Sequence, residues 1–158
     1  INMETIGFYA GSFDPFTNGH MQIVKKASKC FSKIIIGIAK NSEKVIRIDK
    51  EKMKEAIEKT IREQNLENVY VVLYDGLTVA EAQKQGATIL IRGLRNGTDY
   101  QYEETIAEVN TKLSGLDTCY FRAGELRIPF FKHGYGALWK WSRCFKICAR
   151  SRIWNSKK

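Results

Sequence analysis

Apolar residues recur along the chain in two alternating patterns. Short, nearly continuous apolar runs predict β-strands at residues 5–9, 34–39, 69–74, 88–91 and 117–121. Apolar residues spaced three or four positions apart predict helices at residues 21–31, 49–64, 78–85 and 99–113. Because strands and helices alternate, the pattern predicts an α/β fold, with a parallel sheet of about five strands and helices on both faces.

The loops that follow the first four strands leave the same edge of the predicted sheet. In open parallel sheets, ligands bind beyond the carboxyl ends of the strands. The segments after residues 9, 39, 74 and 91 are therefore the expected walls of a binding site.

The first of these loops leads from a strand into a helix and ends at His20. Gly11 and the pair Asp14-Pro15 are turn formers, which places His20 in the first turn of the helix. Free backbone N–H groups and the helix dipole favour an anion there, and Gly19 has no side chain to keep a phosphate away. A histidine at such a junction is also a common cap or core residue, but the whole arrangement favours a phosphate site.

Two arginines follow the fourth strand. Arg92 and Arg95 stand three residues apart around Gly93, where each guanidinium can hold phosphate oxygens in a bidentate manner. Paired arginines are usually solvated surface residues, but their place at the binding edge favours function. Lys44, in the loop after the second strand, has a weaker case by itself, because a single loop lysine is usually solvated.

The motif Thr17-Asn18-Gly19-His20 is similar to the T/H-x-G-H signature of the nucleotidyltransferase superfamily, which has a Rossmann-like fold. Residues 11–20, together with Ile91-Arg92-Gly93-Leu94-Arg95, resemble the bacterial phosphopantetheine adenylyltransferase family over about residues 5–126. The resemblance implies adenylyl transfer from ATP to 4′-phosphopantetheine, which yields dephospho-coenzyme A and pyrophosphate. The shared signature leaves open another acceptor, as in a cytidylyltransferase.

The resemblance also implies roles for individual residues. His20 would stabilise the transition state. The residues that match ATP contacts are Ser12, Phe13, His20, Gly93, Leu94, Arg95 and Glu103. Those that match phosphopantetheine contacts are Ser12, Lys44, Thr78 and Arg92. Mg²⁺ would arrive with ATP and need no dedicated protein ligands, and the family's common homohexamer is the implied assembly.

Two positions depart from the family within the matched region. Met53 stands where the family usually has an arginine, and Ser42 stands near a common proline. Neither belongs to the His20 loop.

Length and cysteine content narrow the class of protein. A chain of 158 residues suits one domain, and no apolar stretch is long enough to span a bilayer. The N-terminus lacks a signal-peptide pattern, so we expect a cytoplasmic protein. The four cysteines, Cys30, Cys119, Cys144 and Cys148, have the spacing of neither a disulfide framework nor a zinc site.

The charge of the chain is concentrated in its last part. The net charge is +9, and residues 127–158 contain nine Lys or Arg, no Asp or Glu, and all three tryptophans. Residues 1–126 are therefore neutral overall. This change predicts a boundary near residue 126. Together with the resemblance, it implies a nucleotidyltransferase domain at 1–126 and an aberrant basic, Trp-rich tail at 127–158 in place of the C-terminal helices of the family.

A frameshift near codon 126 is the hypothesis that explains this tail best. Arg127 to His133 has a possible coding sequence that reads Gly-Phe-His-Ser-Ser-Ser when one base is dropped. That restores a triple serine which the family has at this place, next to ATP. The alternative is a native basic arm that binds nucleic acid or an anionic membrane. We expect neither as a partner.

Overall fold

The computed structural model describes residues 4–40, 49–95 and 97–123. In this part of the chain the strands are β1 (Ile6–Gly11), β2 (Lys33–Ala39), β3 (Val69–Tyr74), β4 (Ile89–Leu94) and β5 (Asp117–Arg122). The helices are α1 (Asn18–Ala27), α2 (Lys50–Glu63), α3 (Thr78–Lys84) and α4 (Gly97–Ser114). Lys44, Ser42 and the predicted tail lie outside the described residues.

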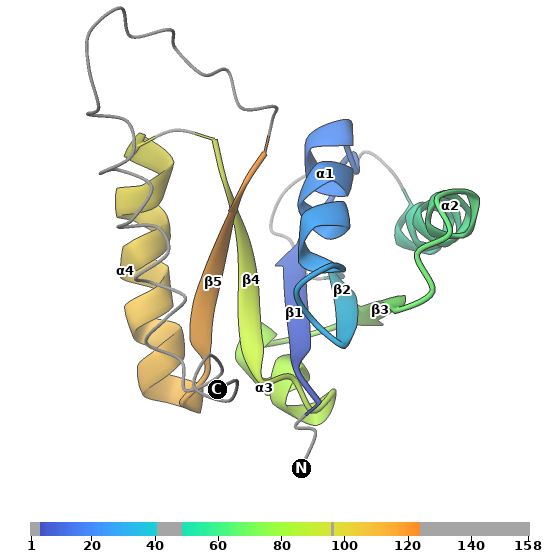
Figure 1. The fold of residues 1–158 in the computed structure, drawn as a ribbon. Helices are drawn as coiled ribbons and strands as arrows, with labels where there is room; N and C mark the ends of the chain where they lie inside the picture. Colours follow the sequence, from blue (N-terminus) through green and yellow to red (C-terminus); the bar gives the residue numbers. More distant parts are fainter. Residues whose placement is uncertain (1–3, 41–48, 96, 124–158) are drawn as a thin grey trace, which may run out of the picture. The chain divides into compact units, whose positions relative to one another are not determined.

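The strands form one parallel sheet in the order β3-β2-β1-β4-β5 (Figure 1). The chain builds outward from β1 to β3 and then returns to the other side of β1 with β4 and β5. The direction of winding therefore reverses between β1 and β4. In open parallel sheets, ligands bind at the carboxyl ends of the strands at such a reversal.

Each face of the sheet has its own hydrophobic core, which confirms the α/β prediction with helices on both faces. On β2, Ile34, Ile36 and Ile38 belong to the core shared with α1 and α2. Ile35 belongs to the opposite core, which includes Val79 and other residues of α3. The alternation follows from the two-residue period of a strand, and the apolar run on β2 is continuous because helices cover both faces.

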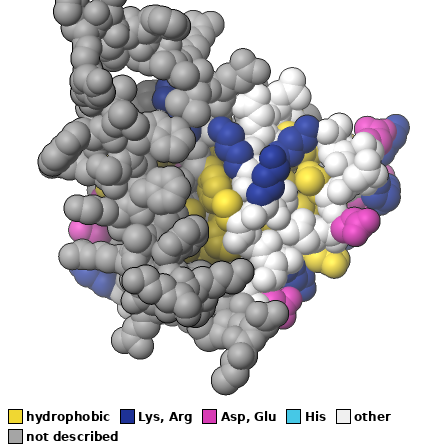
Figure 2. Space-filling view, in the orientation of Figure 1, with side chains coloured by type: hydrophobic (Ala, Val, Ile, Leu, Met, Phe, Trp, Pro, Cys, Tyr) yellow, Lys and Arg dark blue, Asp and Glu magenta, His cyan; other side chains and the backbone are white. Residues whose placement is uncertain are grey.

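Helix α2 is amphipathic in the expected way. Asp49 caps its first turn by accepting a hydrogen bond from the Lys52 N–H at 3.0 Å. The exposed side of α2 carries ion pairs four residues apart, Lys54 with Glu58 and Lys59 with Glu63. Lysine or arginine and acidic side chains lie next to one another on the surface where α2 is placed (Figure 2). Met53, which departs from the family pattern, is buried in the core.

Two element boundaries differ from the predicted ones in ways that affect the site. Helix α1 begins at Asn18 rather than at residue 21, because Thr17 has the extended backbone of an N-cap. Strand β4 continues to Leu94 because Arg92, Gly93 and Leu94 pair with β5. The apolar run alone could not reveal this extension, since Arg92 and Gly93 interrupt it.

Within the described residues, no helix has both the length and the apolar character required to cross a membrane.

Candidate active site

The loop between β1 and α1 is held by a cluster of aromatic rings. The Phe13 ring is only 3 % exposed and packs edge-on against Tyr9, Phe16 and His20, with ring centroids 5.2 to 5.3 Å apart. Phe13 has a φ of 44°, a left-handed conformation that is uncommon for a bulky residue and that its packing holds in place. Because its side chain is in the core, only the backbone of Phe13 is available to a ligand. Ser12, directly before it, is exposed.

His20 is the third residue of α1, and its two ring nitrogens have different tasks. The backbone N–H of Thr17 donates to Nδ1 at 2.9 Å, in the position where Glu or Gln completes a capping box. Since Nδ1 accepts this bond, the proton of the neutral ring is assigned to Nε2, which remains as a donor. The capping role considered from the sequence is therefore real, and it is compatible with a second role for Nε2.

The surroundings of His20 favour this neutral form. Burial, followed by the positive charge of Arg95, lowers the pKa of His20 below its ordinary value. At neutral pH the imidazole therefore offers one directed N–H rather than a full positive charge.

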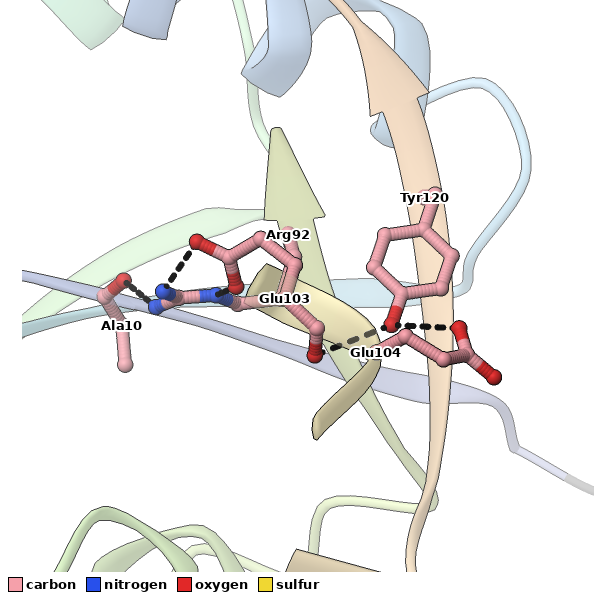
Figure 3. A network of polar contacts seen from close by, with 5 residues as sticks. All are labelled: Ala10, Arg92, Glu103, Glu104 and Tyr120. Atoms are coloured by element: carbon pink, nitrogen blue, oxygen red, sulfur yellow. Dashed lines mark hydrogen bonds and ion pairs between the residues drawn. The ribbon is translucent and has the colours of Figure 1, made fainter. Parts of the chain in front are cut away.

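Arg92 lies on β4 beside β1 and is fixed by Glu103 of α4 (Figure 3). Its Nε and Nη2 donate to the two carboxylate oxygens of Glu103 at 2.6 and 2.8 Å, and Nη1 donates to the Ala10 carbonyl at 3.3 Å. Burial alone would lower the pKa of Arg92, but the hydrogen bonds and charge of Glu103 raise it overall. Arg92 thus stays charged, and two of its five N–H groups are left for another acceptor.

Tyr120 of β5 contacts α4 at Glu103 and at the neighbouring Glu104. The Tyr120 hydroxyl of β5 lies 3.3 Å from the Glu103 carbonyl and 3.3 Å from Oε2 of Glu104, and it donates to either (Figure 3). The network joins β1, β4, β5 and α4 around one guanidinium. The sequence match placed Glu103 with ATP, whereas in the structure both of its carboxylate oxygens are engaged by Arg92; an ATP contact stays a prediction.

Arg95 and Gly93 complete the end of β4. The Arg95 side chain is 81 % exposed, and its backbone N–H and Nε both lie 3.2 Å from Oδ2 of Asp99. A methyl group at Gly93 would collide with the buried side chain of Ile23 on α1. A side chain at this position would therefore force Ile23 to shift.

A cavity of about 100 Å³ adjoins Arg92 on the side of α3 and α4. Thr78, the first residue of α3, lines it, and its hydroxyl lies 2.8 Å from that of Tyr74. The other lining residues are Phe8, Ala10, Leu90, Ile91, Arg92, Ile106 and Asn110. The cavity has mainly apolar walls, with polar groups from Thr78, Arg92 and Asn110.

Sequence reasoning missed Ile106 and Asn110. Their four-residue spacing places them on one face of α4, which is the available signal. It was too weak to find them because α4 buries none of its described residues fully and has apolar residues on several sides. Only the packing of α4 beside β4 identifies the face toward the cavity.

The structure thus gathers the described candidate residues at the carboxyl edge of the sheet. Ser12, Phe13 and His20 come from the β1–α1 connection, and Arg92, Gly93, Leu94 and Arg95 from the end of β4. Thr78 and Glu103 come from α3 and α4. Among described residues, no three His, Cys, Asp or Glu side chains are grouped to hold a metal ion.

Comparison with known proteins identifies the family of the chain. The sequence model of the cytidylyltransferase-like family matches residues 8–119. A phosphopantetheine adenylyltransferase of Lachnoclostridium phytofermentans is 43% identical over 117 residues, covering 73% of this chain and 71% of that protein. One from Streptococcus pneumoniae is 39% identical over 142 residues, covering 89% of this chain and 86% of that protein.

Solved structures support the fold at much lower identity. The bifunctional NMN adenylyltransferase/ADP ribose pyrophosphatase of Francisella tularensis has a TM-score of 0.58 and 18% identity, covering 79% of this chain and 40% of that one. The lipopolysaccharide core biosynthesis protein of Thermoplasma volcanium has a TM-score of 0.55 and 17% identity, covering 78% and 98%. The sequence matches, together with the shared α/β fold, place the chain in the cytidylyltransferase-like family, among the phosphopantetheine adenylyltransferases, which are nucleotidyltransferases.

Proposed function

We propose that this protein transfers the adenylyl group of ATP to 4′-phosphopantetheine. A phosphate oxygen of phosphopantetheine attacks the α-phosphorus of ATP, and the bond from that phosphorus to the bridging oxygen of the β-phosphate breaks. Pyrophosphate leaves with the electron pair, and dephospho-coenzyme A is formed. No covalent enzyme intermediate is required, so positioning and charge stabilisation supply the catalysis.

The observation that carries the proposal is His20, whose Nδ1 accepts a hydrogen bond from the Thr17 N–H and which therefore presents an N–H at Nε2. Its position at the reversal between β1 and β4 suits a donor aimed at the charge that develops on the transferred phosphoryl group. The fixed tautomer means that the ring needs no reorganisation during the reaction.

The Arg92 side of the site suits the acceptor. Phosphopantetheine has a phosphate at the end of a flexible arm that contains amides and methylene groups. The two N–H groups of Arg92 not used by Glu103 and Ala10 match the phosphate, and the adjoining cavity offers apolar walls with Thr78 and Asn110 for the arm.

The ATP side is proposed from the remaining positions. Ser12, the Phe13 backbone, Gly93, Leu94 and the exposed Arg95 lie beside His20 or at the adjacent strand end. Mg²⁺ would arrive bound to the ATP phosphates, and it would neutralise part of their charge. The homohexamer and the cytoplasmic location expected from the sequence remain predictions.

The test is a reconstituted reaction of the full chain with ATP, Mg²⁺ and 4′-phosphopantetheine, followed by chromatography of the products. We expect pyrophosphate and dephospho-coenzyme A only when both substrates are present. A version with residues 127–158 in the restored reading frame is tested beside it, so that an effect of the tail is recognised. Product formation from CTP but not ATP, or no product from either version, would contradict the proposal.

A further inference from the structure

Lys50 is a buried cation that the proposed reaction leaves without a role. It is the first residue of α2, and only 8 % of its surface is exposed, which is rare for lysine. Its Nζ donates a hydrogen bond to the backbone carbonyl of Ser12 at 2.8 Å. This contact joins α2 to the loop that leads to His20, across 38 positions of the sequence.

An anion would stabilise the buried ammonium group of Lys50. A lysine ammonium has three N–H donors, and one of them is used by Ser12. Between residues 4 and 123, leaving aside those not described, no carboxylate forms an ion pair with Lys50. A buried charge is costly unless it is paired, so an anion bound to this loop would gain from the nearby positive charge of Lys50.

The contact also sets the direction of a peptide group. In a planar trans peptide the C=O and the following N–H point in opposite directions. Because Lys50 holds the Ser12 carbonyl, the Phe13 N–H is turned away from Lys50. Phe13 has the left-handed backbone of this loop, so its peptide is the one whose orientation most needs a restraint.

We propose that Lys50 is a positioning residue for the triphosphate of ATP. It fixes the Ser12–Phe13 peptide so that its N–H and the Ser12 hydroxyl are presented together, and its charge raises the affinity of the loop for polyphosphate. The inference rests on the proposed function, because it takes the β1–α1 loop to be the phosphate-binding loop.

The test compares three variants of the full chain by their thermal stabilisation with inorganic tripolyphosphate and with ATP. K50M keeps the length of the side chain and removes its charge. K52M makes the same charge change two residues away at an exposed position of α2 and serves as the control. K50R restores the charge. Each shift in Tm is measured against the same variant without ligand, which separates binding from a loss of stability.

We expect K50M to weaken tripolyphosphate binding about tenfold or more, K52M to change it less than about twofold, and K50R to recover most of it. Equal affinity of K50M and K52M would overturn the inference, as would a failure of tripolyphosphate to stabilise both the wild-type chain and the version with residues 127–158 in the restored reading frame. The reconstituted reaction distinguishes the two proposals. A chain that forms dephospho-coenzyme A although K50M binds like K52M refutes only the role of Lys50.

Discussion

The Thr17 backbone N–H donates to Nδ1 of His20 at 2.9 Å, and this one contact both caps α1 and leaves the ring proton on Nε2. Stability and chemistry are therefore joined in a single side chain. A substitution of His20 separates the effect on stability from the effect on catalysis only if it replaces the acceptor at Nδ1 without replacing the donor at Nε2.

In the version with residues 127–158 in the restored reading frame, we expect His20→Ala to remain folded but to lose about 0.5–2 kcal/mol of stability with the cap, and to lower adenylyl transfer about a thousandfold or more. His20→Gln is the matched control, because a Gln side chain at this position accepts the same bond from Thr17. It should keep most of the stability and still lose most of the transfer. Denaturant unfolding measures the stability of each variant, and steady-state rates measure its adenylyl transfer. Near-normal turnover in either variant would remove His20 from catalysis.

The lowered pKa of His20 predicts a loss of stability in mild acid. Above about pH 6.5 the ring is neutral in both the folded and the unfolded chain. As the pH falls below this value, the unfolded chain binds the proton first, and the free energy of unfolding falls until the folded pKa is passed. Protonation of Nδ1 also breaks the bond from Thr17. Unfolding between pH 7 and pH 5 should therefore depend less on pH in His20→Gln than in the wild type; identical slopes would refute this.

Arg92→Ala should mainly raise KM for phosphopantetheine, and Arg95→Ala should mainly raise KM for ATP. Each variant removes a charge-assisted contact of about 1.5–3 kcal/mol that is already present in the ground state. That corresponds to roughly tenfold to a hundredfold in KM. Initial rates measured with each substrate varied in turn give both KM values for each variant. Equal effects of both variants on both substrates would show that the two arginines do not divide the substrates in this way.

Glu103→Gln tests whether Glu103 acts through Arg92. The amide keeps the size of the side chain but replaces one of two accepting oxygens with a donor, so the bidentate hold on Arg92 is lost. We expect KM for phosphopantetheine to rise about tenfold while KM for ATP changes little. Arg92→Lys keeps a positive charge but has no planar guanidinium that could form two parallel hydrogen bonds with Glu103. It should therefore also raise KM for phosphopantetheine and change KM for ATP little. A rise in KM for ATP alone would favour a direct ATP contact instead.

The frameshift hypothesis predicts that the given chain and a version with residues 127–158 in the restored reading frame differ in their affinity for ATP. If residues 127–158 arise from a frameshift, the chain lacks a loop of hydroxyls and backbone donors for ATP, and several hydrogen bonds of about 1.5–3 kcal/mol each are lost. Removing one base near codon 126 should strengthen ATP binding by orders of magnitude. Titration calorimetry of both versions measures this. Comparable affinities would refute the effect of the frameshift on function, whatever the gene sequence proves to be.

Local patterns in the sequence were sufficient for the elements and indicated His20, Arg92 and Arg95 as candidate site residues. The other candidates came from the family resemblance. The two-residue and 3.6-residue periods are properties of neighbouring positions, so the strands and helices of the described region could be predicted within a few residues. The turn residues before His20 and the arginines around Gly93 predicted a phosphate site because their chemistry depends on residue type and spacing. The order of strands in the sheet has no such local signal.

Only the tertiary structure decided which groups meet. Strand order placed the reversal between β1 and β4, which brings Arg92 beside Ala10, 82 positions away. The pairing of Arg92 with Glu103 and of Lys50 with Ser12 depends on how α4 and α2 pack. The spacing of Lys50 from Met53 and Ile57 places it on the inward face of α2, but nothing in the sequence identifies Ser12 as its partner. The sequence by itself therefore determined the elements and the residue types at their ends. The partners of each charge were decided by long-range packing, because a side chain's contacts depend on which distant segments the fold brings to it.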